Sequence, residues 1–403
     1  MKNNIIVLFA TILLLFPLIG NTCSMYKITK NGRTIVGNNE DFLSPNNQFW
    51  FEVAGDKKFG VMYMGRINNF AQGAINEAGL VFDGFANSEL AVTNTAGKTK
   101  ISIVNALRNI MQSMATVEEV KVYLETIDLS FLSSSMLVFV DKSGTYLIVE
   151  GELLIIGEES EKSFSNFYYS QINSLSEVNI PRFQKGQQFL NTTQGKASFD
   201  YCSKVMDNMK TESSEVTSTQ FSTIYDLTSL KIRLYLYTDF SNYVELDLKK
   251  ELKKGNHKTM MIDLFEKDTN SIAYQFYTKY NDSNNPVLFL KEKMNPEQYS
   301  EEELKNKGVN WGINVVGYEW LKNKKDPKTA IKVFKYGLKL MPNDFDLYDS
   351  LGEAYLDNKE WNKAIINYAK SLTLNPENQN AIKKLLECKE KKESFNSKNN
   401  NEN

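Results

Sequence analysis

The sequence predicts an α+β domain of layered architecture, followed by a small all-α unit. Strand-like segments fill the chain from residue 23 to about residue 90, helical periodicity replaces them at residues 102–128, and strands resume at residue 136. This order is typical of α+β or layered folds and argues against an alternating parallel sheet. Near the C-terminus, similar residues recur 34 positions apart, which predicts a helical repeat.

The composition fits one large globular domain with a smaller one. The chain has 403 residues, of which 42% are hydrophobic, so it can bury an ordinary core. Its 47 basic and 49 acidic residues give a net charge of −2. This balance lacks the basic footprint of a nucleic-acid binder, so no nucleic-acid partner is expected. Because no cluster has the spacing of metal ligands, neither a metal nor a cofactor is predicted.

The N-terminus has the pattern of a signal peptide. Lys2 precedes a mostly apolar run at residues 5–19, which ends at Gly20, Asn21 and Thr22. A membrane-spanning helix would need ~20 apolar residues. We therefore assign residues 1–22 to a signal peptide and expect an exported protein, either periplasmic or secreted.

The first strands are predicted from period-two patterns and turn residues. Residues 23–29 and 33–37 flank Asn31-Gly32, a strong hairpin signal. Further strands are expected at residues 49–54, 60–66 and 80–85. The aromatic and methionine side chains in two of these strands either line an apolar acyl pocket or belong to the core: Phe49, Trp50, Phe51, Met62 and Met64.

Two helices and a second group of strands follow. Apolar residues recur at helical spacing between Ile103 and Met114, and Thr116 with Glu119 forms the capping box of a second helix. Another helix is expected after Pro181. The strands that follow the first two helices are predicted at residues 136–140, 146–150, 153–156 and 164–169, with a closing hairpin at residues 230–248.

The C-terminal part contains a tetratricopeptide pattern. Ala330, Phe334 and Pro342 recur as Ala364, Tyr368 and Pro376, each pair 34 residues apart. We place this repeat unit at residues 306–392, after a polar linker at residues 276–305. Such repeats bind partner peptides or dock domains, so a protein or peptide partner is possible here. The Asn-, Lys- and Ser-rich tail at residues 393–403 is predicted to be disordered.

The chemistry is predicted to centre on Cys23. Cleavage after Thr22 would give this residue a free α-amino group beside its thiol, a pair that can act as base and nucleophile without histidine. The chain has a single histidine, His257, in a Lys-rich stretch typical of a surface position. Cys202 and Cys388, the other cysteines, fall in different predicted domains and are expected to be buried and unpaired.

The segments around Cys23 resemble the choloylglycine hydrolase and penicillin V acylase family. The resemblance covers about residues 23–250 and rests on short blocks in the family's order, at residues 23–26, 37–42, 76–80, 136–150, 166–167 and 224–226. It implies an N-terminal-nucleophile hydrolase of αββα fold over residues 23–275. It also implies hydrolysis of a linear, non-peptide amide C–N bond in a small N-acyl substrate.

The resemblance implies roles for particular residues. Cys23 would be the nucleophile and its own α-amine the base. Asp41 would accept a hydrogen bond from that amine or from the thiol, although an aspartate here also suits a turn after a strand. Asn166 would stabilise the oxyanion of the tetrahedral intermediate, although it also suits a strand edge or turn.

Three further positions carry over less directly. Strict counting from the 76–80 block places the second oxyanion residue at Ala86, and a shift of one places it at Asn87. Arg182 corresponds to a late arginine that supports the nucleophile, or it simply begins a helix. The family's early arginine is Asn38 here, which removes a positive charge beside the thiol and makes the transfer of bile-salt or penicillin substrates unsafe.

Two classes of function fit the sequence. The first is an amide hydrolase that forms an acyl-thioester on Cys23, with an acyltransferase as its close variant. The second is an inactive lipoprotein-type binding protein, anchored to the membrane by acylated Cys23 and using the repeat unit. The preceding Gly20-Asn21-Thr22 is a poor match to a lipoprotein signal and is also awkward for ordinary signal peptidase.

Overall fold

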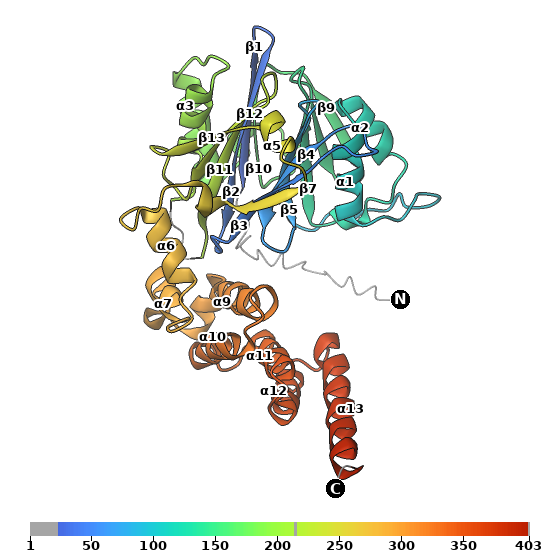
Figure 1. The fold of residues 1–403 in the computed structure, drawn as a ribbon, viewed down its shortest axis with the longest axis vertical. Helices are drawn as coiled ribbons and strands as arrows, with labels where there is room; N and C mark the ends of the chain where they lie inside the picture. Colours follow the sequence, from blue (N-terminus) through green and yellow to red (C-terminus); the bar gives the residue numbers. More distant parts are fainter. Residues whose placement is uncertain (1–22, 213–215, 402–403) are drawn as a thin grey trace, which may run out of the picture.

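The computed structural model describes residues 23–212 and 216–401 (Figure 1). The predicted signal peptide at residues 1–22 lies outside this part. The described residues form two antiparallel sheets with helices on their outer faces, and helices alone follow after residue 261. The predicted class, an α+β domain followed by an all-α unit, is confirmed.

The first sheet, sheet A, contains β1, the strand that begins directly after Cys23. Its strands run in the order β10-β1-β2-β11-β12-β13, and every neighbouring pair is antiparallel. Their bounds are β1 Ser24–Lys30, β2 Arg33–Phe42, β10 Glu161–Ser165, β11 Ser218–Asp226, β12 Lys231–Leu236 and β13 Tyr243–Asp247. The predicted hairpin at Asn31-Gly32 joins β1 to β2, and both residues have the positive φ that such a turn requires.

The second sheet, sheet B, is largely a meander. Its strands run in the order β14-β3-β4-β5-β6-β7-β8-β9. Their bounds are β3 Asn47–Glu52, β4 Val61–Arg66, β5 Ala71–Asn76, β6 Val81–Ala86, β7 Ser135–Val140, β8 Tyr146–Glu150, β9 Leu153–Gly157 and β14 His257–Met260. Strand β5 was not predicted. Its segment AQGAIN carries two alanines, an asparagine and a glycine, all depleted in strands, which hide the period-two pattern.

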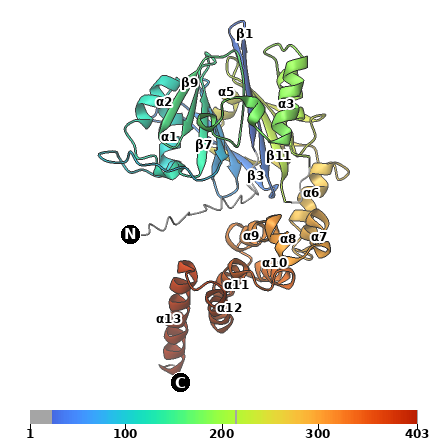
Figure 2. The ribbon, with the colours of Figure 1, turned by 180° about the vertical axis from the view of Figure 1, so that it is seen from behind.

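The two sheets pack face to face between two layers of helices, as both views show (Figures 1 and 2). One buried cluster joins Met25 and Val36 of sheet A to Phe49 and Met62 of sheet B. Outside sheet B lie α1 (Ile103–Ser113) and α2 (Val117–Leu124), and outside sheet A lie α3 (Pro181–Thr192) and α4 (Phe199–Asn208). The layer order is therefore αββα, as the family resemblance implies.

Local signals explain where these helices begin. The side chain of Thr116 accepts from the backbone of Glu119, whose carboxylate caps Thr116 in return, so the predicted capping box of α2 is confirmed. Pro181 occupies the first turn of α3, where its missing N–H costs nothing. Helix α4, capped by Ser198, was not predicted, although its buried face covers sheet A.

The C-terminal helices form a separate buried cluster. Their bounds are α6 Ile272–Tyr280, α7 Leu288–Met294, α8 Glu301–Asn306, α9 Val309–Tyr318, α10 Pro327–Leu340, α11 Phe345–Asp357, α12 Trp361–Leu374 and α13 Gln379–Asn401. The repeated Ala330 and Ala364 are fully buried, as are Phe334 and Tyr368, 34 residues apart. All-α structure is confirmed here, whereas the tetratricopeptide identity and its partner stay predictions.

Two expectations for this region were wrong in local structure. The span predicted to be a polar linker, 276–305, forms α7 and α8 and contributes Phe289, Leu290 and Leu304 to the helical core. Its asparagines concentrate in a short turn before α7, and they obscure the apolar residues that follow this turn. Helix α13 continues to Asn401, where a disordered tail was expected. Glu387 pairs with Lys384 and Lys391 in the part of this helix before the tail.

The helical region contacts the end of the sandwich that holds Cys23. Leu43, directly after β2, is buried in the helical cluster, and Trp311 of α9 packs edge-on against Phe42. Asn46 donates to Glu319. These contacts link α9 to the loop that follows Asp41. No helix in the described part of the chain is both long and apolar enough for a membrane span.

Candidate active site around Cys23

Strand pairing places Cys23 between two polar residues. Ser24 pairs with Asn39 of β2 on one side and with Ser165 of β10 on the other. In antiparallel pairing the next residues along are Glu40 and Asn166, so these flank Cys23. Cys23 is 5% exposed and belongs to the cluster between the two sheets. Its thiol therefore lies inside the sandwich.

The carboxyl group at hydrogen-bond distance from the thiol belongs to Glu40. Cys23 Sγ donates to Glu40 Oε2 over 3.3 Å. Gln72 of β5 donates to the same oxygen at 2.7 Å, and Asn38 donates to Oε1 at 3.0 Å. Glu40 was not among the predicted site residues. Its strand position, two residues from Asn38 and facing the same way, is the signal that could have found it.

A second missed carboxyl group, Asp83 of β6, meets Glu40 across the sandwich. Both are 1% exposed. Burial is the main cause that raises the pKa of Asp83 well above its usual range, and Glu40 raises it further. Burial also raises the pKa of Glu40, from 4.5 to about 7. For Cys23, burial raises the thiol pKa, and the charge of Glu40 adds to this effect.

This pair predicts how stability changes with pH. Because the pKa of Glu40 is about 7 in the folded protein and 4.5 otherwise, the folded chain retains a proton that the unfolded chain releases. The resulting stability is fully present below about pH 4.5 and is lost as pH rises through 7. We expect the free energy of unfolding in urea to fall by about 2 kcal/mol from about pH 5.5 to about pH 8.5. In Glu40→Gln this decrease should shrink, and an unchanged pH dependence in that variant would contradict the shift.

Arg182 contacts the backbone of Cys23 and the end of β10, and its support of a nucleophile stays a prediction. It enters at the first turn of α3 and is 8% exposed. Its Nη2 donates to Cys23 O at 3.1 Å, to Ser165 Oγ at 2.9 Å and to Asn166 Oδ1 at 2.8 Å. One guanidinium nitrogen thus joins Cys23, the residue directly before β1, to the end of β10. Ser165, which also donates to Cys23 O, was not predicted.

Asp41 lies on the opposite face of β2 from Glu40. Its carboxylate accepts from the hydroxyls of Thr211 and Thr219 and lies 3.8 Å from Arg182 Nε. Its backbone N–H bonds to the Cys23 thiol and lowers the pKa of that thiol. The expected bond from the thiol to a carboxylate is therefore made by Glu40. The predicted bond between the Asp41 carboxylate and the α-amine of processed Cys23 stays a prediction.

The two candidate oxyanion residues converge at the end of β6. Asn166 Nδ2 donates to Ala86 O at 2.8 Å, which brings Asn166 against the segment that contains Asn87. Asn87 is 7% exposed, and its side-chain Nδ2 has no hydrogen-bond partner among the described residues. A buried amide nitrogen without an acceptor is suited to an oxyanion. Ala86 offers only its backbone, so this geometry favours Asn87 over Ala86.

Arg66, which was not among the predicted site residues, supplies part of the positive charge that is lost because Asn38 stands at the position of the family's early arginine. Arg66, at the end of β4, interacts electrostatically with Cys23 and Glu40, and both partners raise its pKa against the larger lowering by burial. Its guanidinium carbon lies 3.6 Å from the centre of the Phe42 ring. Arg66 therefore supplies positive charge from sheet B, whereas the family pattern supplies it from β2.

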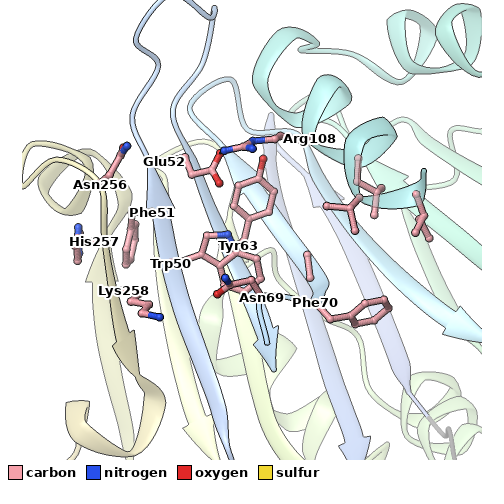
Figure 3. Close-up of a pocket in the computed structure, with 14 residues that line it drawn as sticks. Trp50, Phe51, Glu52, Tyr63, Asn69, Phe70, Arg108, Asn256, His257 and Lys258 are labelled. Carbon is pink, nitrogen blue, oxygen red and sulfur yellow. The ribbon is translucent and has the colours of Figure 1, made fainter. Parts of the chain in front are cut away.

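The apolar residues considered for an acyl pocket divide between two faces of sheet B. Phe49, Phe51, Met62 and Met64 belong to the core that contains Cys23. Trp50 faces outward, stacks on Tyr63 and lines a separate cleft of about 520 Å³ (Figure 3).

That cleft lies between α1 and β14, away from the thiol. Glu52 and Arg108 form an ion pair at one end, and Phe70 lies at the other (Figure 3). His257, expected at the surface, is part of its lining, stacked on Phe51 and half-buried. No group of three or more His, Cys, Asp or Glu side chains placed to hold a metal occurs in the described ranges.

Comparison with known proteins gives structural similarity only. No protein-family model and no curated protein matches the sequence. The chain is similar to a variant of conjugated bile acid hydrolase from Clostridium perfringens, with 17% identity and a TM-score of 0.46 over 59% of this chain and 96% of that one. Penicillin V acylase from Agrobacterium tumefaciens gives 17% and 0.45, over 57% and 86%. These TM-scores are below 0.5, so the fold and site described above rest on this chain's own geometry.

Proposed function

We propose that this protein hydrolyses a linear amide C–N bond of a small N-acyl substrate, with Cys23 as the nucleophile. The observation that carries the proposal is the position of the Cys23 thiol. It lies 3.3 Å from a buried carboxyl group and beside Asn166, whose amide meets the segment containing Asn87. Nucleophile, proton acceptor and candidate oxyanion donors are the parts that acyl transfer requires.

The reaction proceeds through an acyl-thioester. The thiolate of Cys23 adds to the amide carbonyl, and the amides of Asn166 and Asn87 stabilise the oxyanion. The C–N bond breaks as the leaving nitrogen receives a proton, and the acyl group stays on sulfur. Water then attacks the thioester and releases the acid. Transfer of the acyl group to another amine would use the same intermediate, and the site geometry does not favour it over hydrolysis.

The mature chain is proposed to begin at Cys23 after export. The position of Cys23 supports this start, because its backbone carbonyl is fixed by Ser165 and Arg182. Lipid attachment at Cys23 is disfavoured, since a thioether-linked lipid on a sulfur that faces the core would have to displace packed side chains. Export to the periplasm or exterior, and peptide binding by the helical unit, stay predictions.

A mass measurement of the acyl-enzyme tests the proposal. The mature protein is mixed with a panel of N-acyl amides that vary in acyl chain and amine, quenched in acid, and weighed intact. We expect the free protein to have the mass of a chain that starts at unmodified Cys23. We also expect one panel member to add the mass of its acyl group, at the peptide that contains Cys23. A mature chain that starts elsewhere, a lipid on Cys23, or adducts on other residues alone would overturn the proposal.

A further inference from the structure

Glu40 and Asp83 form a carboxyl pair built from both sheets beside the nucleophile. Glu40 is fixed by Gln72 and Asn38, and Asp83 Oδ1 accepts from the backbone of Gly84 at 2.8 Å. The other oxygen of Asp83, Oδ2, is buried and has no donor among the described residues. Asn38 makes a smaller hydrogen-bond contribution to Asp83, and the carboxyl groups of Asp83 and Glu40 interact as side-chain hydrogen-bond partners.

That contact needs a proton. Two ionised carboxylates offer four acceptors and no donor, so they cannot bond to each other in a dry site. A proton on Asp83 Oδ2 satisfies this orphaned oxygen and donates to Glu40. Glu40 then keeps an ionised oxygen for the thiol of Cys23, and the pair carries one negative charge.

We propose that Glu40 is the proton acceptor of the Cys23 thiol, and that Asp83 remains protonated to hold Glu40 in place. This inference rests on the amide hydrolysis proposed above. The proton of Sγ passes to Glu40 Oε2, and the sulfur electron pair forms the C–S bond. When the C–N bond breaks, Glu40 returns that proton to the leaving nitrogen. In the second half, Glu40 takes a proton from water, and hydroxide adds to the thioester. Glu40 then protonates the departing thiolate.

Other charged and titratable groups surround the pair on each packed element. Arg66 approaches from β4 and Tyr225 from β11, and both interact electrostatically with Glu40. Asp41 lies on the far face of β2, beside Arg182 of α3. Among these, Glu40 is the carboxyl group whose oxygen contacts Sγ. The role proposed for Glu40 does not require a free α-amine on Cys23. Proton transfer from the thiol is therefore independent of the cleavage that would expose this amine.

Glu40→Gln separates proton transfer from simple electrostatics. The charge of Glu40 raises the pKa of Cys23, so its removal makes the thiol more acidic. We expect the pH midpoint of Cys23 alkylation by iodoacetamide to shift downward. We also expect the rate of acyl-thioester formation to fall about 100-fold, because the acceptor is lost. If Glu40 acts only through its charge, acylation will hold or become faster as the thiolate fraction rises, and the proposal is overturned.

Controls keep the test decisive. Glu245→Gln, an exposed position on β13 of the same sheet, should leave both rates unchanged. Glu40→Asp keeps an acid and should retain the acidic limb of the acylation pH profile at a reduced rate, whereas Glu40→Gln should lose that limb. An acidic limb that persists in Glu40→Gln overturns the proposal, as does an unchanged alkylation midpoint. If the wild-type protein forms no acyl-thioester at all, the amidase proposal itself fails. If the wild type is acylated and Glu40→Gln is acylated equally fast, only the role proposed for Glu40 fails.

Discussion

Replacing Cys23 with alanine is expected to abolish amide hydrolysis, with a loss of about 10⁴-fold or more in kcat/KM. The thiol is the group positioned between Glu40 and Asn166, with its Sγ in contact with the Glu40 carboxyl group. Loss of the nucleophile removes the acyl-enzyme route altogether. The residual rate should then be only what the oxyanion donors contribute to attack by water.

The same substitution should leave the fold intact. Alanine keeps the backbone of Cys23, whose carbonyl makes the contacts with Ser165 and Arg182. Only one buried sulfur is lost, so we expect a change of about 1 kcal/mol in the free energy of unfolding. The measurements are amide turnover on the panel member that acylates the wild type and urea unfolding of both proteins.

The matched control is Cys388→Ala. Cys388 is also buried and free, but it lies on α13 in the helical region, so its replacement should preserve turnover. Equal losses in the two variants would mean that cysteine substitution harms the protein as a whole. Turnover that survives in Cys23→Ala would remove Cys23 from the mechanism.

Much of the fold was predictable because it follows from local patterns. The Asn31-Gly32 turn, the capping box at Thr116 and the helix after Pro181 are each specified by a few neighbouring residues. Strand β5 and helix α4 were missed for the opposite reason. The alanines and glycine of β5 give a weak local strand signal, although β5 pairs with β4 and β6, its neighbours in the chain. Helix α4 is stabilised by packing on strands of sheet A that are distant in the chain.

The site residues likewise divide into those that a local sequence pattern predicts and those that depend on the pairing of the strands. The family motif points to Asp41, but it does not say which face of the strand meets the thiol. Side chains alternate along β2, so the adjacent Glu40 and Asp41 lie on opposite faces. Pairing with β1 turns Glu40 toward Cys23, and that pairing is a property of the sheet. Asp83 was detectable only as a charged residue between the inward-facing Val81 and Phe85 of an apolar strand.

Replacing Arg182 with methionine is expected to reduce both stability and catalysis. The side chain of methionine fills a similar length but makes none of the three bonds of Nη2 to Cys23 O, Ser165 and Asn166. It also removes the cation beside the buried carboxylate of Asp41. We expect a loss of about 3 kcal/mol or more in the free energy of unfolding, because a buried charge loses its partner. Turnover should fall about 100-fold, because Asn166 is no longer oriented.

A double variant separates the two effects. Asp41→Asn in the Arg182→Met background removes the carboxylate left without its cation, so we expect stability to recover by about 2 kcal/mol or more. Turnover should not recover, because the amide of Asn166 still lacks the donor that fixes its oxygen. Arg182→Lys keeps the charge, yet a single ammonium cannot reproduce the planar contacts, so it should restore stability more than turnover. Unfolding in urea and the kinetics of acylation give these values. If Asp41→Asn restores turnover together with stability, Arg182 acts only as the counter-charge of Asp41, and its support of Asn166 through the Oδ1 contact is dispensable.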